Sequence, residues 1–284
     1  MPLSAHTIPT IVGQAILESL RENLVYARAF NEDYLGDVVP GNAVKIPSIG
    51  AVTVKDYMTY TDMDEEEVDD ASQTMTIDQQ KYFNVVIDDI DAAMAKPAIM
   101  AAYAREAAFQ LQATIDDYLG GVLAAGGAIT DDLGDETTPL DINSVNVGET
   151  LRLIARKLDD AKTPRSGRFV IVPPWFVEDL VTANIADSTD NAGELAEGLV
   201  ARYAGFDVLM SHQTPNTSGD KWKIVAGSKI SATWALAINK TEMLRHPKQF
   251  ADIMRGLAVY GARVTRAATI AVATCDEATE PSGD

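Results

Sequence analysis

The chain has little of what metal centres and disulfide frameworks are made from. It contains one cysteine, Cys275, so no disulfide can form within the chain. The three histidines, His6, His212 and His246, are far apart, and none has a second histidine at the spacing of a zinc site. We therefore expect no metal centre built on these residues.

Motifs that bind phosphate or carry a nucleophile are also missing. The sequence contains no GxSxG, GxxxxGK[ST] or GxGxxG pattern. No apolar run approaches the roughly 18 uninterrupted residues that a membrane span needs. We expect no catalytic residue, no cofactor and no contact with a membrane.

Basic residues are scarce relative to acidic ones. Lysine and arginine number 23 against 42 aspartates and glutamates, which gives a formal net charge of -19. An acidic surface repels phosphate, so direct DNA binding is a poor first hypothesis. Apolar residues make up 46% of the chain, enough for a substantial core.

The order of expected elements is mixed. Residues 1–43 carry an amphipathic helical pattern that needs something to dock on, and residues 44–60 and 72–87 alternate like the strands of a long hairpin. The longest helix is expected over 97–119, ending at Gly120 and Gly121.

Further along, helices are expected over 147–162 and 175–184. A buried strand is expected at 168–174, and further strands are expected at 205–215 and 221–227. The segment 254–275 is expected to be rich in strand and broken at Gly256 and Gly261. Without a regular strand–helix–strand alternation, the pattern favours the α+β class.

An acidic run lies at the tip of the expected hairpin. It does not fit a calcium loop, because Glu67 and Gln73 stand where glycine and glutamate are needed. A solvated tip is the commonest form of such a run, and a loose divalent-cation site shared between chains stays open. The acidic residues are Asp62, Asp64, Glu65, Glu66, Glu67, Asp69 and Asp70.

A segment in the last third of the chain carries the opposite charge, with an excess of basic residues. Within it, Glu242 and Asp252 are the acidic residues. Our hypothesis is that the acidic tip of one subunit lies near the basic segment of a neighbour, where complementary charge sets the register of assembly. The basic residues are Lys240, Arg245, Lys248, Arg255, Arg263 and Arg266.

Four stretches carry a resemblance to a known family. They are "ATIDDYLGG" from Ala113, "GRFVIVPPWFVEDL" from Gly167, "GFDVLMSHQTP" from Gly205 and "FADIMRGLAVYGARVTRAATIAVATC" from Phe250. In their order and spacing they resemble the major capsid protein of tailed bacteriophages, with the Hong Kong 97-like fold.

The resemblance implies a division of the chain. It would comprise an N-terminal arm (1–43), an extended β-hairpin loop (44–87), a peripheral domain with a long spine helix (88–149 and 247–277), an axial domain (150–246) and a C-terminal tail (278–284).

The resemblance also implies a function. Many copies would assemble as hexamers and pentamers into an icosahedral shell that encloses double-stranded DNA without sequence-specific binding. Portal and scaffolding or decoration proteins would be further partners. The protein would be a virion capsid component assembled in the cytoplasm of a bacterial host.

Three alternatives stay open at this point. An encapsulin-like shell would enclose a cargo protein with the same fold. A soluble hydrolase would use acidic pairs and a divalent metal in a deep polar pocket. A surface-layer or adhesion protein would need an export signal, which the start "MPLSAHTIPTIVG" does not resemble.

Overall fold

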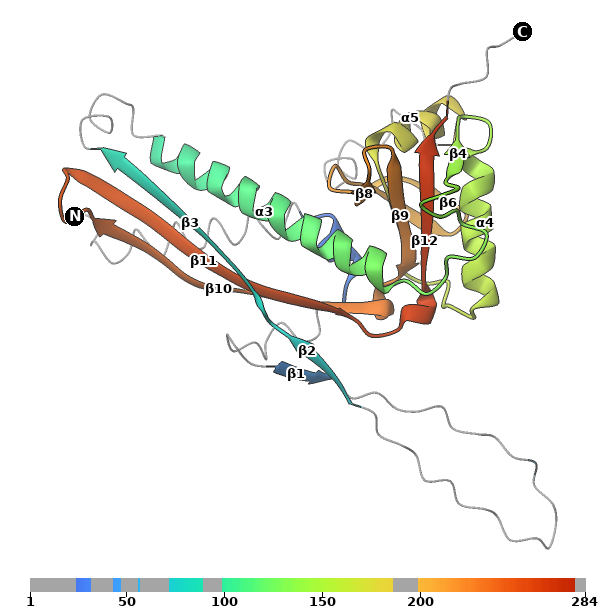
Figure 1. Ribbon diagram of the computed structural model, residues 1–284, viewed down its shortest axis with the longest axis horizontal. Coiled ribbons are helices and arrows are strands. Elements are labelled where there is room, and N and C mark those ends of the chain that lie inside the picture. Colours follow the sequence, from blue (N-terminus) through green and yellow to red (C-terminus); the bar gives the residue numbers. More distant parts are fainter. Residues whose placement is uncertain are drawn as a thin grey trace, which may run out of the picture.

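The computed structural model describes residues 24–31, 43–46, 56, 72–88, 99–185 and 199–278. These residues form two lobes, a long slender one and a more compact one (Figure 1). We call them the elongated lobe and the compact lobe. None of the described helices combines the length and the apolar character needed to cross a membrane.

The elongated lobe is a three-stranded antiparallel sheet with one long helix along it (Figure 1). The helix, α3, spans Ile99–Gly126 and is about 42 Å long at 1.5 Å per residue. Its buried residues recur every three or four positions and pack on Met254 and Ala258 of the sheet. The strands lie in the order β10 (Ala232–Arg245), β11 (Ala251–Val264) and β3 (Gln79–Asp88).

The compact lobe is built on a seven-stranded mixed sheet. Helices α4 (Val147–Asp160) and α5 (Pro174–Thr182) contribute to the core on one face of it. The strand order is β4 (Leu140–Ile142), β12 (Ile270–Glu277), β9 (Lys221–Ser228), β5 (Arg168–Val172), β7 (Phe206–Met210) and β6 (Leu199–Tyr203), with β8 (Asn216–Thr217) beside β9.

Alternate residues of this sheet enter two different cores. In β5, Val170 and Val172 face the core that contains α4 and α5, whereas Phe169 and Ile171 join the core of α3. All five residues of β5 are consequently buried. The C-terminal part of α3 thus joins the two lobes through one continuous core.

A small antiparallel pair, β1 (Ala43–Ile46) and β2 (Gln73–Thr76), packs on the elongated lobe. Its buried residues include Val44 and Met75, which lie against Val259 and Ala235 of the long strands. A short 3-10 turn, η1 (Tyr26–Ala29), lies near the junction of the lobes and is buried in the core of α3.

Most expected elements of the compact lobe are confirmed, namely α4, α5, β5, β7 and β9. In the elongated lobe the strand expected over 72–87 is divided into β2 and β3, and β3 pairs with β11 instead of β1. Strand β10 had no prediction. Within the expected hairpin, residues 47–55 and 57–71 lie outside the described residues. The expected amphipathic helix also lies outside them, apart from residues 24–31.

Two expectations about glycine are wrong. The long helix does not end at Gly120 and Gly121 but continues to Gly126, because Leu119 and Leu123 keep its apolar face buried. Strand β11 runs unbroken through Gly256 and Gly261. A Cβ at Gly256 would lie 2.4 Å from the Phe83 ring, so the glycine permits close contact instead of a break.

The division into peripheral and axial domains stays a prediction, and the sheet pairing places two strands differently from it. Strand β10, assigned to residues 150–246, pairs with β11 in the elongated lobe. Strand β12, assigned to residues 247–277, pairs with β9 and β4 in the compact lobe. A boundary at 246–247 falls in the turn between β10 and β11.

Candidate assembly surfaces

The sheet of the elongated lobe has a face that points away from α3, which we call the outer face, and several apolar side chains are exposed on it. Tyr82 and Val86 of β3 are 79% and 50% exposed, and Leu244 of β10 is 41% exposed. Their partners across the sheet are Leu257 and Ile253, and residues paired across a sheet share one face. The outer face therefore presents aliphatic and aromatic side chains to solvent, with an ion pair between β10 and β11 separating them.

Part of this face is already covered within the chain. The pair β1 and β2 buries Val259 and Ala235 and packs against Leu257. Farther along the same strands, Tyr82 and Val86 have no comparable cover among the described residues. The part of the outer face that β1 and β2 cover binds a pair of extended strands through apolar side chains.

Strand β3 is also an edge strand in the described part of the chain, because the sheet order places it beside β11 alone. An edge strand offers unpaired N–H and C=O groups that can extend a sheet across subunits. The outer face and this edge lie together on β3, so one incoming segment can contact both.

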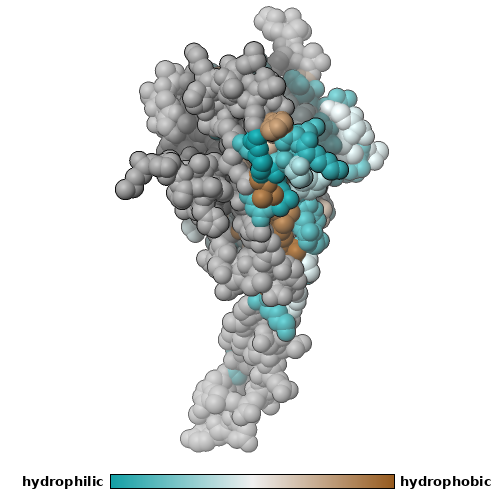
Figure 2. Space-filling model, turned by 90° about the vertical axis from the view of Figure 1, so that its left-hand side faces the viewer, coloured by the Kyte–Doolittle hydropathy of each residue, from teal (hydrophilic) through white to brown (hydrophobic). Residues whose placement is uncertain are grey.

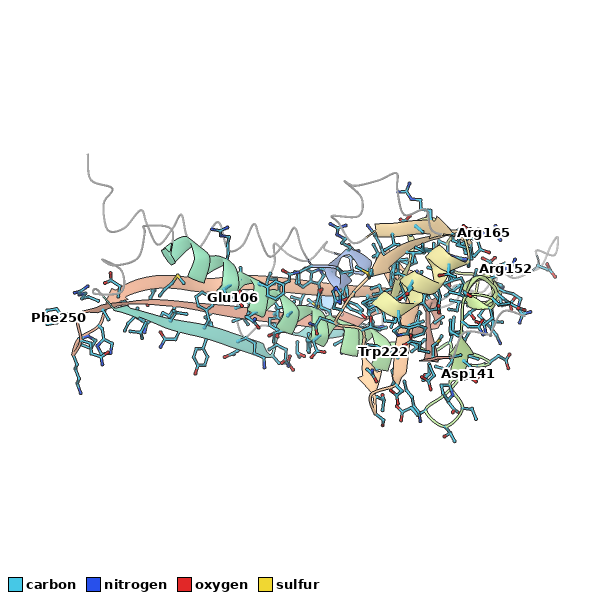
Figure 3. All side chains as sticks on the ribbon, turned by 90° about the horizontal axis from the view of Figure 1, so that it is seen from above. Glu106, Asp141, Arg152, Arg165, Trp222 and Phe250 are labelled. Carbon is cyan, nitrogen blue, oxygen red and sulfur yellow. The ribbon has the colours of Figure 1, made fainter. Side chains whose placement is uncertain are left out.

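The turn between β10 and β11 forms the distal end of the elongated lobe (Figure 3). The His246 N–H donates to the Ala251 carbonyl at 2.9 Å, and the Lys248 N–H donates to His246 Nδ1 at 3.2 Å. These bonds shape a turn whose last side chain, Phe250, is 81% exposed. Viewed from this end, the described surface shows hydrophobic residues among hydrophilic ones (Figure 2).

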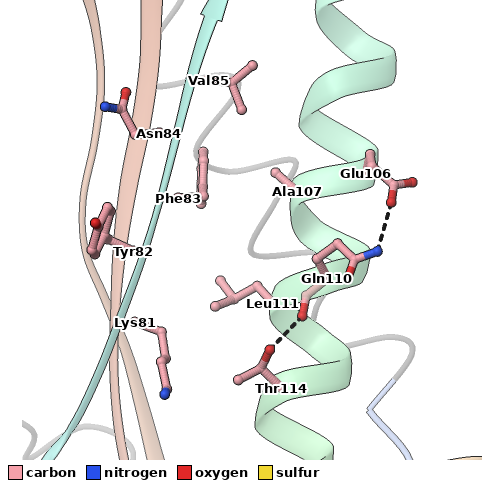
Figure 4. Close-up of a pocket in the computed structure, with 10 residues that line it drawn as sticks. All are labelled: Lys81, Tyr82, Phe83, Asn84, Val85, Glu106, Ala107, Gln110, Leu111 and Thr114. Carbon is pink, nitrogen blue, oxygen red and sulfur yellow. Dashed lines mark hydrogen bonds between the residues drawn. The ribbon is translucent and has the colours of Figure 1, made fainter.

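A groove of about 360 Å³ runs between β3 and α3 (Figure 4). Phe83 and Leu111 make it partly apolar, and the Gln110 side chain donates to Glu106 Oε1 at 2.9 Å. Lys81 and Glu106 are the lining residues that carry charge. The groove suits a packed side chain better than a reaction centre, since it gathers no set of acids, bases and nucleophiles.

The predicted basic residues are spread along the β10–β11 hairpin and the turn after it. Arg245 pairs with Asp252 at 3.2 Å, and Arg255 pairs with Glu242. The Arg263 guanidinium donates to the Thr74 carbonyl at 2.7 Å and so helps to hold β2.

Lys248 lies in the distal turn and Arg266 lies near the compact lobe, and both are exposed. The structure does not bring these five basic residues into one patch, and the side chain of the sixth, Lys240, lies outside what the structure describes. The acidic residues Asp62, Asp64, Glu65, Glu66, Glu67, Asp69 and Asp70 lie outside the described residues. The predicted contact between the acidic run and the basic segment therefore stays a prediction.

Reactive and metal-binding groups are sparse in the part of the chain that the structure describes. No group of three or more His, Cys, Asp and Glu residues is placed to hold a metal ion there. Cys275 is fully buried, and burial raises the pKa of its thiol to about 12. The thiol therefore stays protonated near neutral pH, where the thiolate would be needed for nucleophilic attack.

Comparison with known proteins gives a consistent result. A family model described as "Phage capsid protein" matches residues 70–274, which is more than half of the chain. No curated protein sequence matches the chain.

Solved structures match over most of the chain. A structure from Mycobacterium phage Che8 has a TM-score of 0.70 at 25% identity, covering 88% of this chain and 90% of that one. The capsid of cyanophage P-SCSP1u has a TM-score of 0.65 at 18% identity, covering 84% and 85%.

A virus-like particle from Pyrococcus furiosus has a TM-score of 0.58 at 11% identity, covering 92% and 97%. This structure and the cyanophage capsid show the fold alone. With the family match over residues 70–274 and these shared folds, the chain belongs to the phage capsid protein family and is a structural capsid protein with the Hong Kong 97-like fold.

Proposed function

We propose that this protein is the major shell subunit, which assembles as hexamers and pentamers into an icosahedral capsid around double-stranded DNA. The observation that carries the proposal is the exposed outer face, where Tyr82, Val86 and Leu244 sit on one side of a narrow sheet. Exposed apolar side chains gathered on one face of a protein mark a surface that another protein surface covers.

The shape of the elongated lobe suits a large contact between copies. Standard protein interfaces bury about 1,600 Å² in total, and obligate ones bury more. The elongated lobe is long and thin, so much of its surface is available to neighbours (Figure 1). Each copy would cover the outer face of the next, and repetition of that contact would close a shell.

Charge is expected to guide the order of contacts. In this proposal the acidic run at 62–70 of one subunit approaches the basic segment of another, with Lys248, Arg263 and Arg266 as receiving residues. Arg245 and Arg255 already have carboxylate partners in their own chain, so they would join a mixed network. Long-range attraction sets register and rate more than affinity.

The net charge fits a container for DNA better than a DNA-binding protein. At -19 the chain is repelled by phosphate, so packaged DNA would be enclosed and not gripped. Portal and scaffolding or decoration proteins complete the proposed set of partners, and the protein is proposed to act without enzymatic activity. Assembly is proposed to take place in the bacterial cytoplasm.

The outer face gives the test of assembly. We expect the double variant Tyr82→Ser, Val86→Ser to fold but to form no closed particles in electron microscopy, because its neighbour loses the apolar contact. Asn84→Ser is the matched control, since Asn84 lies between them on the same strand and is also exposed. Particles of normal shape and yield from the double variant would refute the proposed role of this face.

Charge reversal separately tests the proposed attraction between the acidic run of one subunit and the basic segment of another. Replacing Asp64, Glu65, Glu66 and Glu67 by lysine should block assembly and leave the subunit folded, as measured by light scattering and circular dichroism. A control that reverses Asp276 and Glu277, on the last strand of the compact lobe, should assemble. Normal particles from the fourfold variant would contradict the pairing.

The encapsulin-like alternative differs in what the shell encloses. The family match to phage capsid proteins favours the viral function. The Pyrococcus furiosus particle shares the fold alone at 11% identity, and the fold does not distinguish the contents. Nucleic-acid and protein analysis of purified particles would decide, with double-stranded DNA expected and a single abundant cargo enzyme as the contrary result.

A further inference from the structure

Residues 24–31 cross the junction between the two lobes, and we call them the strap. At one end the Asn31 N–H donates to the Ala232 carbonyl at 2.8 Å, and the Asn31 carbonyl accepts from the Thr233 hydroxyl at 3.1 Å. At the other end the Val25 N–H donates to Asp116 Oδ2 at 3.1 Å. The strap therefore ties the start of β10 to the middle of α3.

The strap also reaches the compact lobe. The Tyr26 side chain is fully buried and lies against Gly120 of α3, where an added Cβ would be 3.0 Å from the ring. The same Cβ would be 3.3 Å from Pro215, which follows β7 in the compact lobe. Tyr26 thus fills the space where α3, the strap and the compact lobe meet.

Asp116 is an unusual anchor for this segment because it is a carboxylate only 3% exposed. One oxygen accepts the Val25 N–H, whereas Oδ1 is buried and has no hydrogen-bond partner. An ionised carboxylate with a buried, unsatisfied oxygen is costly. A proton on Oδ1 removes the cost of burying a charge, and Oδ2 still accepts the Val25 N–H.

Burial raises the pKa of Asp116 to about 7, although the N–H groups of Val25 and Tyr26 act to lower it. Tyr26 on the strap interacts electrostatically with Asp116 and with the next residue of α3, Asp117, and Tyr260 on β11 interacts with Asp117. Burial raises the pKa of both tyrosines, so they stay neutral near pH 7. Asp117 is exposed on α3.

We propose that the strap and Asp116 form a proton-dependent latch between the two lobes, closed when Asp116 is neutral and loosened when it ionises. A group whose pKa is raised by folding stabilises the folded state fully below its unfolded pKa, near 3.9, and that contribution is lost as pH rises through the folded value. The latch therefore weakens progressively as pH rises from about 4 to about 7 and stays weak above that. It controls how firmly the strap is held on α3 at the junction of the lobes.

Hydrogen exchange followed by mass spectrometry tests the latch on the full-length protein. The oligomeric state is checked by light scattering at each pH, and rates are corrected for the intrinsic effect of pH. Protection of the amides of residues 25–31 should fall by about tenfold or more between pH 5.5 and pH 8.5, because Asp116 changes from mostly neutral to mostly ionised. Peptides from 147–172 in the compact lobe should change little.

Two variants separate the anchor from its neighbour. Asp116→Asn stays neutral at every pH, so its strap should keep at pH 8.5 the protection seen at pH 5.5. Asp117→Asn is the matched control on the next residue and should show the wild-type fall. Asp116→Asn retaining the full wild-type fall would overturn the proposal.

The wild-type profile is decisive even if Asp116→Asn does not fold. Equal strap protection at the two pH values would overturn the latch. So would a parallel loss of protection in residues 147–172, because it would show unfolding of the whole chain. A fall confined to the strap that levels off above about pH 7 is the supporting result.

Discussion

The two lobes treat their sheets in opposite ways. In the compact lobe the central strand β5 is buried on both faces, by the α4 and α5 core on one side and the α3 core on the other. In the elongated lobe α3 covers one face, whereas Tyr82 and Val86 on the other are exposed. The compact lobe buries its apolar surface within the subunit, whereas the elongated lobe leaves part of its apolar surface exposed.

Two phenylalanines, one in each lobe, allow the sharpest test of this contrast. Replacing the buried one is expected to cause the largest change in the free energy of unfolding. Phe176 is fully buried in the compact lobe, and Phe250 is 81% exposed at the distal turn. Phe176→Ala should lower the free energy of unfolding by about 3–5 kcal/mol. Phe250→Ala should change it by less than about 0.5 kcal/mol.

Chemical denaturation of both variants gives the measurement for this pair. Equal losses of stability would show that the distal turn of the elongated lobe is packed like the compact core, and the contrast between the lobes would fail.

Glycine gives a second, smaller contrast, within the elongated lobe. A Cβ at Gly261 would lie 2.4 Å from the Thr76 carbonyl, whereas a Cβ at Gly121 would meet nothing within 4 Å. Gly261→Ala should cost about 1–3 kcal/mol by pushing β2 off the sheet. Gly121→Ala should stabilise α3 by up to about 1 kcal/mol.

Thermal unfolding of the two glycine variants checks the signs. Gly121→Ala acting as strongly and in the same direction as Gly261→Ala would show that helix propensity and close contact had been assigned to the wrong positions.

The smallest expected effect concerns an acid on the surface of the compact lobe. A hydrogen bond from Lys157 to Asp132 at 2.6 Å holds the pKa of that carboxyl below its usual range. A lowered pKa stabilises the fold above the unfolded pKa, and the contribution is lost as pH falls through the folded value. This sign is opposite to that of Asp116 at the junction.

Melting temperatures between pH 6 and pH 3 measure the surface pair. Asp132→Asn should slightly reduce the loss of stability on acidification, and the change should shrink in high salt because solvent screens an exposed pair. A larger loss on acidification in the variant would contradict the assigned sign.

The sequence predicts the compact lobe better than the elongated one for a physical reason. Strand β5 is a short apolar run that ends at two prolines, and α4 has a clear apolar stripe. Each pattern lies within one short segment of the sequence, so it can be recognised without knowledge of tertiary contacts. Gly120 and Gly256 mislead because glycine marks both chain breaks and close packing. At these two positions the glycine permits close packing, against the Tyr26 ring at Gly120 and the Phe83 ring at Gly256, and both rings are distant in sequence.

The candidate surfaces are predictable in part. The alternation over 72–87 indicates a two-sided strand, but the side that α3 covers depends on tertiary packing. The pair Asp116 and Asp117 in "ATIDDYLGG" looks uniformly polar, although helical geometry buries the first and exposes the second. The spacing of Asp116, three residues from Leu119 and seven from Leu123, places it beside the apolar stripe and could have identified the buried acid.

The last strands of the described chain are also internal ones. Strand β11 lies between β10 and β3, and β12 lies between β4 and β9. Neither sheet can close while residues 251–277 are still being synthesised. A nascent or prematurely terminated polypeptide therefore lacks a finished subunit surface, so translation itself screens which copies are competent to enter a particle.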